Sequence, residues 1–152
     1  MTAQATIPAD PDAVFAALTD ITNLPAWNAV MTRVVEEPPA LTPGSEWVVE
    51  FHVMGRTWHS RSVLEELDPA ARRFRYRAGT DDGNPSWASW QWDVAAVPEG
   101  ARVTVSWDLH PKTFWRRLLL VRIRSYQLAH QEVPASLEAL ANHVARAATS
   151  AE

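Results

Sequence analysis

Two residues near the C-terminus have side chains and a spacing that suit acid–base chemistry. Tyr126 and His130 are four residues apart, about one turn of an α-helix, so their side chains would project from one face. A neutral imidazole beside a phenol can take a proton from an activated methylene and return one to a carbonyl oxygen. The pair therefore predicts an acid–base site, or two groups that orient a ligand. The structural alternative is a histidine bonded to backbone near Pro134.

An apolar series with steps of three and four residues continues on both sides of this pair and predicts an amphipathic helix over 113–148. Its other members are Leu119, Ile123, Val133, Leu137, Leu140 and Val144. Because Pro134 cannot donate a backbone hydrogen bond, we expect two segments, 113–132 and 134–148, that meet at a bend near His130. The helix needs an apolar surface to lie on, so the stripe that holds the acid–base pair should face the rest of the domain.

Aromatic residues recur at every second position in several stretches between residues 46 and 109, a spacing typical of β-strands. Those assigned to one face of the predicted sheet, together with two serines between them, are Trp47, Phe51, Trp58, Ser60, Ser62, Phe74, Tyr76, Trp90, Trp92 and Trp107. Such a face would suit a flat aromatic ligand, because an offset-stacked pair contributes ~0.5–1.5 kcal/mol beyond burial. The structural alternative is an ordinary packed core. For the strands 57–67 and 72–78, this face requires a suitable turn register or a bulge, because one residue of slip would reverse it.

Turn residues set the expected register of two hairpins. A two-residue loop at Gly55-Arg56 would place His52 opposite His59 on the more polar face. The last hairpin would place Trp92 opposite Trp107. Two imidazoles alone are a weak signal for a metal. The chain also has no Gly-rich phosphate loop, nucleophile elbow or HExxH motif, so neither a metal nor a cofactor is predicted.

Shorter elements precede these strands. Asp10 and Pro11 have the residue types of a helix N-cap and first turn, so a helix should begin there and run to about Asp20. A second short helix or turn follows at 23–27, and β-branched residues predict a strand at 30–37. With an edge strand at the N-terminus, the elements predict an α+β domain. It contains a mostly antiparallel sheet of about seven strands, apolar on one face, and a long C-terminal helix that covers this face.

Composition limits the classes of function. A chain of 152 residues is expected to form one domain, 1–152. The absence of cysteine excludes disulfides, thiol nucleophiles and thiolate metal sites, and a net charge of −4 disfavours nucleic acid as a partner. No apolar run approaches the ~20 residues needed to cross a bilayer. The first residues lack the pattern of a signal peptide, so we expect a cytoplasmic protein. Nothing in the sequence specifies an oligomeric state.

One segment, Phe114–Arg122, mixes bulky apolar and basic residues. Such a segment can make transient contact with a membrane surface, as a carrier that unloads a lipid would require, without stable insertion. It would equally form the first turns of the terminal helix above a cavity, and this second interpretation is the one we favour.

Several segments together are similar to a known family. Ile7–Phe15, Asn23–Asn28, the turns at Gly44 and Leu67–Pro69, and Val133–Leu137 resemble the polyketide cyclase/dehydrase and lipid-transport family of the START-like, or SRPBCC, superfamily. The resemblance covers nearly the whole chain and implies a helix-grip fold, in which a curved sheet wraps the last helix and leaves a deep cavity. Members bind polyketides, lipids, quinones, sterols or hormones. Some cyclise or dehydrate polyketide chains, some only carry ligands, and some act on protein partners.

Three hypotheses follow. The first is a carrier or sensor that binds a small hydrophobic, aromatic or polyketide-like or lipid-like molecule through the aromatic face. The second is an enzyme of the polyketide cyclase/dehydratase type with His130 and Tyr126 as its acid–base groups. The third is a protein-interaction module of the co-chaperone type. The density of aromatic residues on one face favours the first two.

Overall fold

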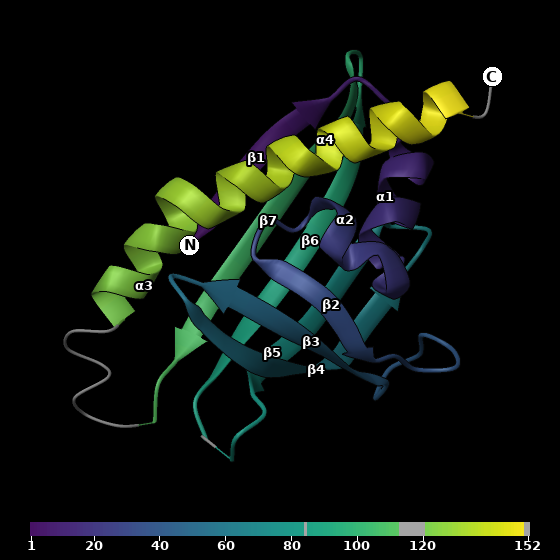
Figure 1. The fold of residues 1–152 in the computed structure, drawn as a ribbon. Coiled ribbons are helices and arrows are strands. Elements are labelled where there is room, and N and C mark those ends of the chain that lie inside the picture. The colour runs from purple at the N-terminus through teal and green to yellow at the C-terminus, as the bar shows by residue number, and fades with distance from the viewer. Residues whose placement is uncertain (84, 113–120, 151–152) are drawn as a thin grey trace.

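The computed structural model describes residues 1–83, 85–112 and 121–150. In this part of the chain, seven strands form one antiparallel sheet, which confirms the predicted sheet of about seven strands, and their order is β1-β7-β6-β5-β4-β3-β2. Their bounds are β1 (Thr2–Ile7), β2 (Met31–Glu36), β3 (Glu46–Val53), β4 (Arg56–Asp68), β5 (Arg73–Thr80), β6 (Trp87–Val97) and β7 (Gly100–His110). Figure 1 shows that the sheet is strongly curved and that the terminal helix crosses its concave side.

The helices lie on the concave side of the sheet (Figure 1). They are α1 (Pro11–Thr19), η1 (Ile21–Asn23), α2 (Leu24–Trp27), α3 (Val121–Gln127), η3 (Leu128–Glu132) and α4 (Val133–Ser150). The predicted start of α1 is confirmed: Asp10 Oδ1 accepts hydrogen bonds from the backbone N–H groups of Asp12 at 2.7 Å and Ala13 at 3.3 Å. These bonds satisfy donors that a helix N-terminus leaves without partners. None of the described helices has the length and apolar composition needed to span a membrane.

The predicted interruption before Pro134 takes the form of a π turn. The five-residue π-helix η3 joins α3 to α4, and the Val133 N–H donates to the Leu128 carbonyl five residues earlier. A π turn contains about one residue more than an α turn. The face of α3 that meets the sheet is therefore offset by about one residue from the face that the periodicity of α4 predicts. The first part of the predicted segment 113–132 lies outside the described residues.

Two predicted hairpin registers are wrong by two residues. The β3–β4 turn is Met54-Gly55, with φ of 50° and 75°, so Glu50 and not His52 is opposite His59. A type I′ hairpin turn requires positive φ at both central residues. The predicted loop at Gly55-Arg56 would have placed an arginine there. In both hairpins a shift of two residues leaves every side chain on its predicted face.

The second wrong register is that of the β6–β7 hairpin, in which Trp90 and not Trp92 is opposite Trp107. The predicted faces of β4 and β5 agree with the structure. A bulge between Leu64 and Glu66 keeps Tyr76 opposite Leu64 on the predicted face. Such a bulge is one of the two arrangements that the alternation of residues in these strands allowed.

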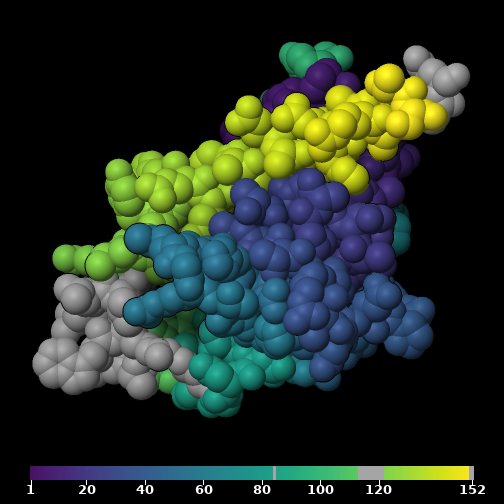
Figure 2. Space-filling view, viewed as in Figure 1, coloured from purple at the N-terminus to yellow at the C-terminus, as the bar shows by residue number. Residues whose placement is uncertain are grey.

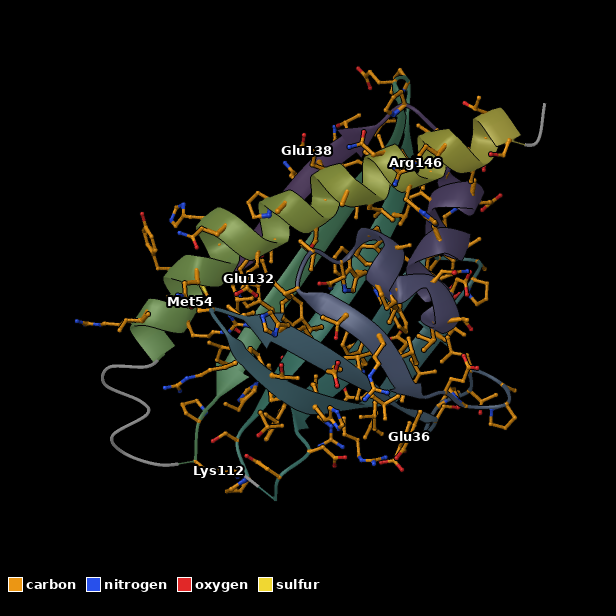
Figure 3. The ribbon with its side chains drawn as sticks, viewed as in Figure 1. Glu36, Met54, Lys112, Glu132, Glu138 and Arg146 are labelled. Carbon is orange, nitrogen blue, oxygen red and sulfur yellow. The ribbon has the colours of Figure 1, made fainter. Side chains whose placement is uncertain are left out.

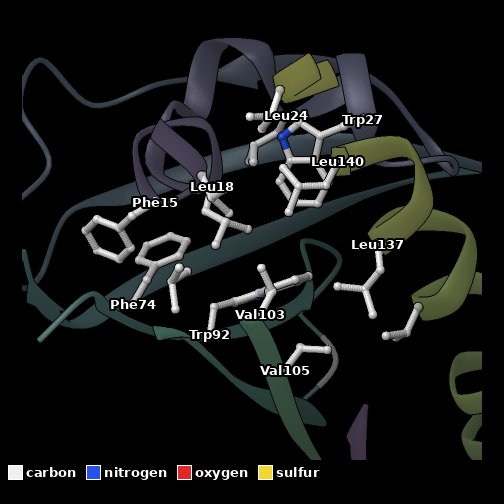
Figure 4. Close-up of a cluster of buried hydrophobic side chains, with 14 of the residues drawn as sticks. Phe15, Leu18, Leu24, Trp27, Phe74, Trp92, Val103, Val105, Leu137 and Leu140 are labelled. Carbon is white, nitrogen blue, oxygen red and sulfur yellow. The ribbon is translucent and has the colours of Figure 1, made fainter. Parts of the chain in front are cut away.

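The packed core fills only one end of the concave side. Figure 4 shows side chains from α1, α2 and α4 that meet side chains from the sheet. The labelled residues are Phe15, Leu18, Leu24, Trp27, Phe74, Trp92, Val103, Val105, Leu137 and Leu140. All of them are buried. Figure 2 shows the terminal helix lying against the segment that contains α2, which hides the interior from this side. α4 is thus held by α1, α2 and β1, and the region below α3 and η3 is left to other side chains.

Candidate functional site

A cavity of about 470 Å³ lies between the sheet and the helical segment α3-η3 with the first turn of α4. Its walls come from strands β2 to β7, from this helical segment and from the chain before β2. Small-molecule sites usually measure ~300–1,000 Å³ and have mostly apolar walls with a few placed polar groups. The cavity has this size and this kind of lining.

The structure places most of the predicted ligand-binding residues at the cavity. Those that line it are Trp47, Phe51, Trp58, Ser60, Ser62, Tyr76, Trp90 and Trp92. Phe74 and Trp107 were also predicted to contact a ligand, but each is 2% exposed and neither lines the cavity. They lie on the concave face beside the cavity, and each stacks on a lining ring, Phe74 on Trp47 and Trp107 on Trp90.

The aromatic rings of the wall form ordered pairs. Phe51 and Trp58 stack with centroids 5.6 Å apart and an interplanar angle of 13°. Trp90 stacks on the buried ring of Trp107 at 5.8 Å and 20°. Because each of these lining rings is held by a neighbour, the wall presents fixed flat surfaces on which an aromatic ligand can stack.

Hydroxyl groups stand among these rings. Ser60 and Ser62 are 8% and 3% exposed and line the cavity. They come from β4, between the rings of Trp58 and Trp47 in the lining. A serine hydroxyl can donate one hydrogen bond and accept two. These hydroxyls are therefore suited to bond a ligand that fills the cavity.

The third hydroxyl is the phenol of Tyr76. Burial raises the pKa of Tyr76 to about 12, and a hydrogen bond with the Trp92 indole offsets part of this rise. The phenol therefore keeps its proton at neutral pH, and its O–H group can donate a hydrogen bond to a ligand carbonyl.

This raised pKa gives a testable result. The chain has two tyrosines, so Tyr126→Phe leaves Tyr76 as the only phenol. In an absorbance titration of this variant, the midpoint should lie at about 12 and not at the ordinary value of 10.0. The sign follows from the raised pKa: the free energy of unfolding that Tyr76 contributes is complete below pH 10 and falls as the pH rises toward 12. A midpoint near 10, with circular dichroism showing a folded chain, would mean that the phenol is open to water.

The predicted acid–base pair does not lie at the cavity. Tyr126 is 62% exposed, and His130 is also exposed. Their rings contact each other at 4.5 Å on the outer side of the helix, and neither lines the cavity. The inward-facing stripe is correct for Val133, Leu137, Leu140 and Val144, which are buried, and wrong for Tyr126 and His130, because the π turn adds a residue between α3 and α4. Of the predicted stripe, Ile123 and Val133 line the cavity. The helical segment adds Arg124, Gln127, Leu128, Glu132 and Ser136 to the lining.

Sequence reasoning missed the polar members of this set and one stack at the sheet. Arg124 and Glu132 are not members of the apolar series, so in a regular helix they would lie on its solvent side. Trp87 and His110 line the cavity and stack at 3.8 Å, with the Arg77 guanidinium 5.5 Å from the Trp87 ring centroid. Pro134 was the one sequence signal for a change of helix geometry before this position. A proline in a helical pattern marks a place where the count of residues per turn can change.

The two histidines of the outer face are not neighbours. His52 Nδ1 lies 3.0 Å from Thr57 Oγ1, and His59 Nε2 lies 3.2 Å from Glu50 Oε2. Hydrogen bonds from Arg33, above all, and from Thr32 and His59 lower the pKa of Glu50 to about 2. Within 1–83, 85–112 and 121–150, no group of three or more histidine or carboxylate side chains could hold a metal ion. The predicted segment Phe114–Arg122 lies almost entirely outside these ranges.

Comparison with solved structures identifies the architecture. Ara h 8.0201 is similar over 96% of this chain and 97% of its own, with a TM-score of 0.73 and 18% identity. CV1439 from Chromobacterium violaceum is similar over 95% of both chains, with a TM-score of 0.73 and 23% identity. The di-domain ARO/CYC StfQ from the steffimycin biosynthetic pathway has a TM-score of 0.73 and 16% identity. The similarity covers 98% of this chain but 46% of StfQ, so this chain spans about half of that protein.

These similarities confirm the helix-grip fold that the resemblance implied. No curated protein sequence matches the chain significantly. A family model described as polyketide cyclase/dehydrase and lipid transport matches residues 1–146. The fold and the family fit a protein that binds hydrophobic ligands or is of the polyketide cyclase type. Since the match extends over almost all of the sequence, the chain belongs to the polyketide cyclase/dehydrase and lipid-transport family.

Proposed function

We propose that the protein binds a small, flat, hydrophobic molecule, aromatic or polyketide-like, in the cavity below α3 and η3, as a carrier or sensor. The observation that supports this most is the lining, in which stacked aromatic rings surround two serine hydroxyls. Aromatic walls favour planar ligands over flexible chains because they offer flat surfaces for stacking.

The energetics require polar contacts in addition to burial. A ligand that hides ~300 Å² of apolar surface gains roughly 7–8 kcal/mol at ~25 cal/mol/Å². Association costs ~4–15 kcal/mol, which consumes much of this gain. Hydrogen bonds to Ser60, Ser62 and Tyr76 would supply the remainder, at about 1 kcal/mol for each bond.

An enzyme of the cyclase/dehydratase type is the second candidate. The family description supports it, as does the similarity of the fold to StfQ, a di-domain ARO/CYC. Tyr76 lines the cavity as a neutral phenol at pH 7, and it would polarise a ligand carbonyl. Such an enzyme would then depend on Tyr76 rather than on the predicted pair, which lies on the outer side of the helix.

Ligand titration tests the proposal. Naphthalene, anthracene and flavone derivatives are added to the protein, and binding is measured by calorimetry and by the melting temperature, which a bound ligand raises by linkage. Linear aliphatic alcohols with a similar apolar surface serve as matched controls. We expect saturable binding of the planar compounds and weaker binding of the linear ones. Equal binding of the two classes would contradict an aromatic-selective site, and no binding of either class would contradict the proposed function.

The predicted acid–base pair gives a second test. Because Tyr126 and His130 do not line the cavity, Tyr126→Phe and His130→Gln should leave ligand affinity within about twofold of the parent protein. Any product formed from a polyketide-like substrate should also be unchanged. Tyr76→Phe is the matched comparison, and it should lose about one hydrogen bond, ~1 kcal/mol of binding free energy. A large loss with His130→Gln and none with Tyr76→Phe would restore the original assignment.

A further inference from the structure

One ion pair stands in the wall of this otherwise apolar cavity. Among the described lining residues, Arg124 and Glu132 are the only ones that carry a formal charge when histidine is neutral. Arg124 Nη1 donates a hydrogen bond to Glu132 Oε1. The side chain of Glu132 is 13% exposed and that of Arg124 is 35% exposed. In Figure 3, Glu132 lies toward the sheet, whereas Glu138 and Arg146 lie on the outer side of α4.

The π turn is what allows this pair to form. Eight residues separate the two positions, which exceeds two α-helical turns of ~3.6 residues by ~0.8 residue, so in a regular helix the side chains would diverge by about 80°. The π-helix η3 lies between them and takes about one residue more in its turn. This extra residue makes up the ~0.8 residue beyond two α-helical turns, so both side chains extend from the same inward face.

The chemistry of the pair indicates what it would bind. A guanidinium has five N–H donors in a planar fork that matches a carboxylate. The ion pair with Glu132 is made through one terminal nitrogen of Arg124, so the fork retains donors. Glu132 is the more buried partner, and its carboxylate has acceptors only, so it cannot donate a hydrogen bond to a ligand anion.

We propose that Arg124 anchors an acidic group of the ligand, a carboxylate or an ionised enol or phenol, and that Glu132 is the internal anion that competes for it. This inference rests on the proposed function and specifies the ligand class: a planar hydrophobic body with an acidic group at the end next to η3. The side chain of Gln127 also lines this part of the cavity. Its amide can donate a hydrogen bond to the same acidic group.

A pair of matched probes tests the anchor. The probes are 2-naphthoic acid, ionised at pH 7, and its neutral analogue methyl 2-naphthoate. Arg124→Gln should weaken binding of the acid by about 10- to 100-fold, as expected for a lost hydrogen bond to a charged group. Glu132→Gln should strengthen binding of the acid by about tenfold, because the competing carboxylate is removed. The ester should bind both variants and the parent protein equally.

The control variant is Arg73→Gln, which removes an ion pair with Asp93 at 2.8 Å that does not line the cavity. It should change neither affinity. If Arg124→Gln does not fold, as judged by its melting curve, the gain for the acid with Glu132→Gln decides the question alone. Binding of both probes without any effect of the two cavity variants would overturn the anchor and leave the proposed function intact. No binding of either probe to the parent protein would instead overturn the proposed function.

Discussion

Truncation of Trp107 to alanine is expected to lower the free energy of unfolding by about 3–5 kcal/mol, the usual range for a fully buried tryptophan. The indole is 2% exposed, and its stacking on Trp90 at 5.8 Å would be lost. Removal of the ring leaves a void beside Trp90 that the closely packed neighbours can close only in part. Urea unfolding monitored by circular dichroism measures the change.

The matched control for this variant is Trp58→Ala. Trp58 is only partly buried and lines the cavity, stacked on Phe51. Trp58→Ala should lower the free energy of unfolding less than Trp107→Ala does. Relative to that loss of stability, it should weaken ligand binding more. If Trp58→Ala were the more destabilising change and Trp107→Ala the more damaging to binding, the division between supporting ring and lining ring would be wrong.

Filling the cavity should remove ligand binding while it preserves the fold. Ser62 is 3% exposed at the cavity wall, opposite Ala78 of the neighbouring strand. In Ser62→Phe the added ring occupies space that a ligand needs, and forcing a ligand past it costs about 1–3 kcal/mol, roughly a 10- to 100-fold loss of affinity. Stability should stay the same or rise, because the ring fills empty volume and buries apolar surface.

Ser89→Phe is the control for cavity filling. Ser89 is on the same sheet, opposite Arg77 and Asp108, but does not line the cavity. Its replacement should leave ligand affinity unchanged. Equal affinities for Ser62→Phe, Ser89→Phe and the parent protein would show that the ligand binds elsewhere.

The faces of the strands could be predicted from the sequence although the hairpin registers could not. Alternation assigns each residue to a face, and an error of two residues, as at Glu50 opposite His59, preserves that assignment. The register itself depends on which two residues adopt positive φ at the turn. Met54 is one of them, and a methionine at such a position has no recognisable sequence signal.

For the terminal helix, the element could be predicted from the sequence but the inward face of its N-terminal part could not. Its existence and its interruption before Pro134 were predicted, but the residues that face the cavity at its N-terminal end were not. A shift of two residues preserves the faces of a strand, but one extra residue in a helical turn rotates all side chains before that turn by about 100° about the helix axis. The π turn therefore exchanged Tyr126 and His130 for Arg124 and Gln127 at the cavity. No pattern in the residues 128–132 distinguishes a π turn from an α turn.

A planar ligand should occupy the cavity between the sheet and the helix, and the most direct test is to locate the bound ligand by the NMR signals of individual residues. The indole N–H groups of Trp47, Trp58, Trp90 and Trp92 report on the wall in ¹H–¹⁵N spectra. On titration with methyl 2-naphthoate, these four signals should move together with a single dissociation constant. The backbone amides of α1, which contributes no lining residue, should stay in place. Saturable shifts confined to Tyr126, His130 and the outer side of the terminal helix, with the four indoles unmoved, would contradict the account.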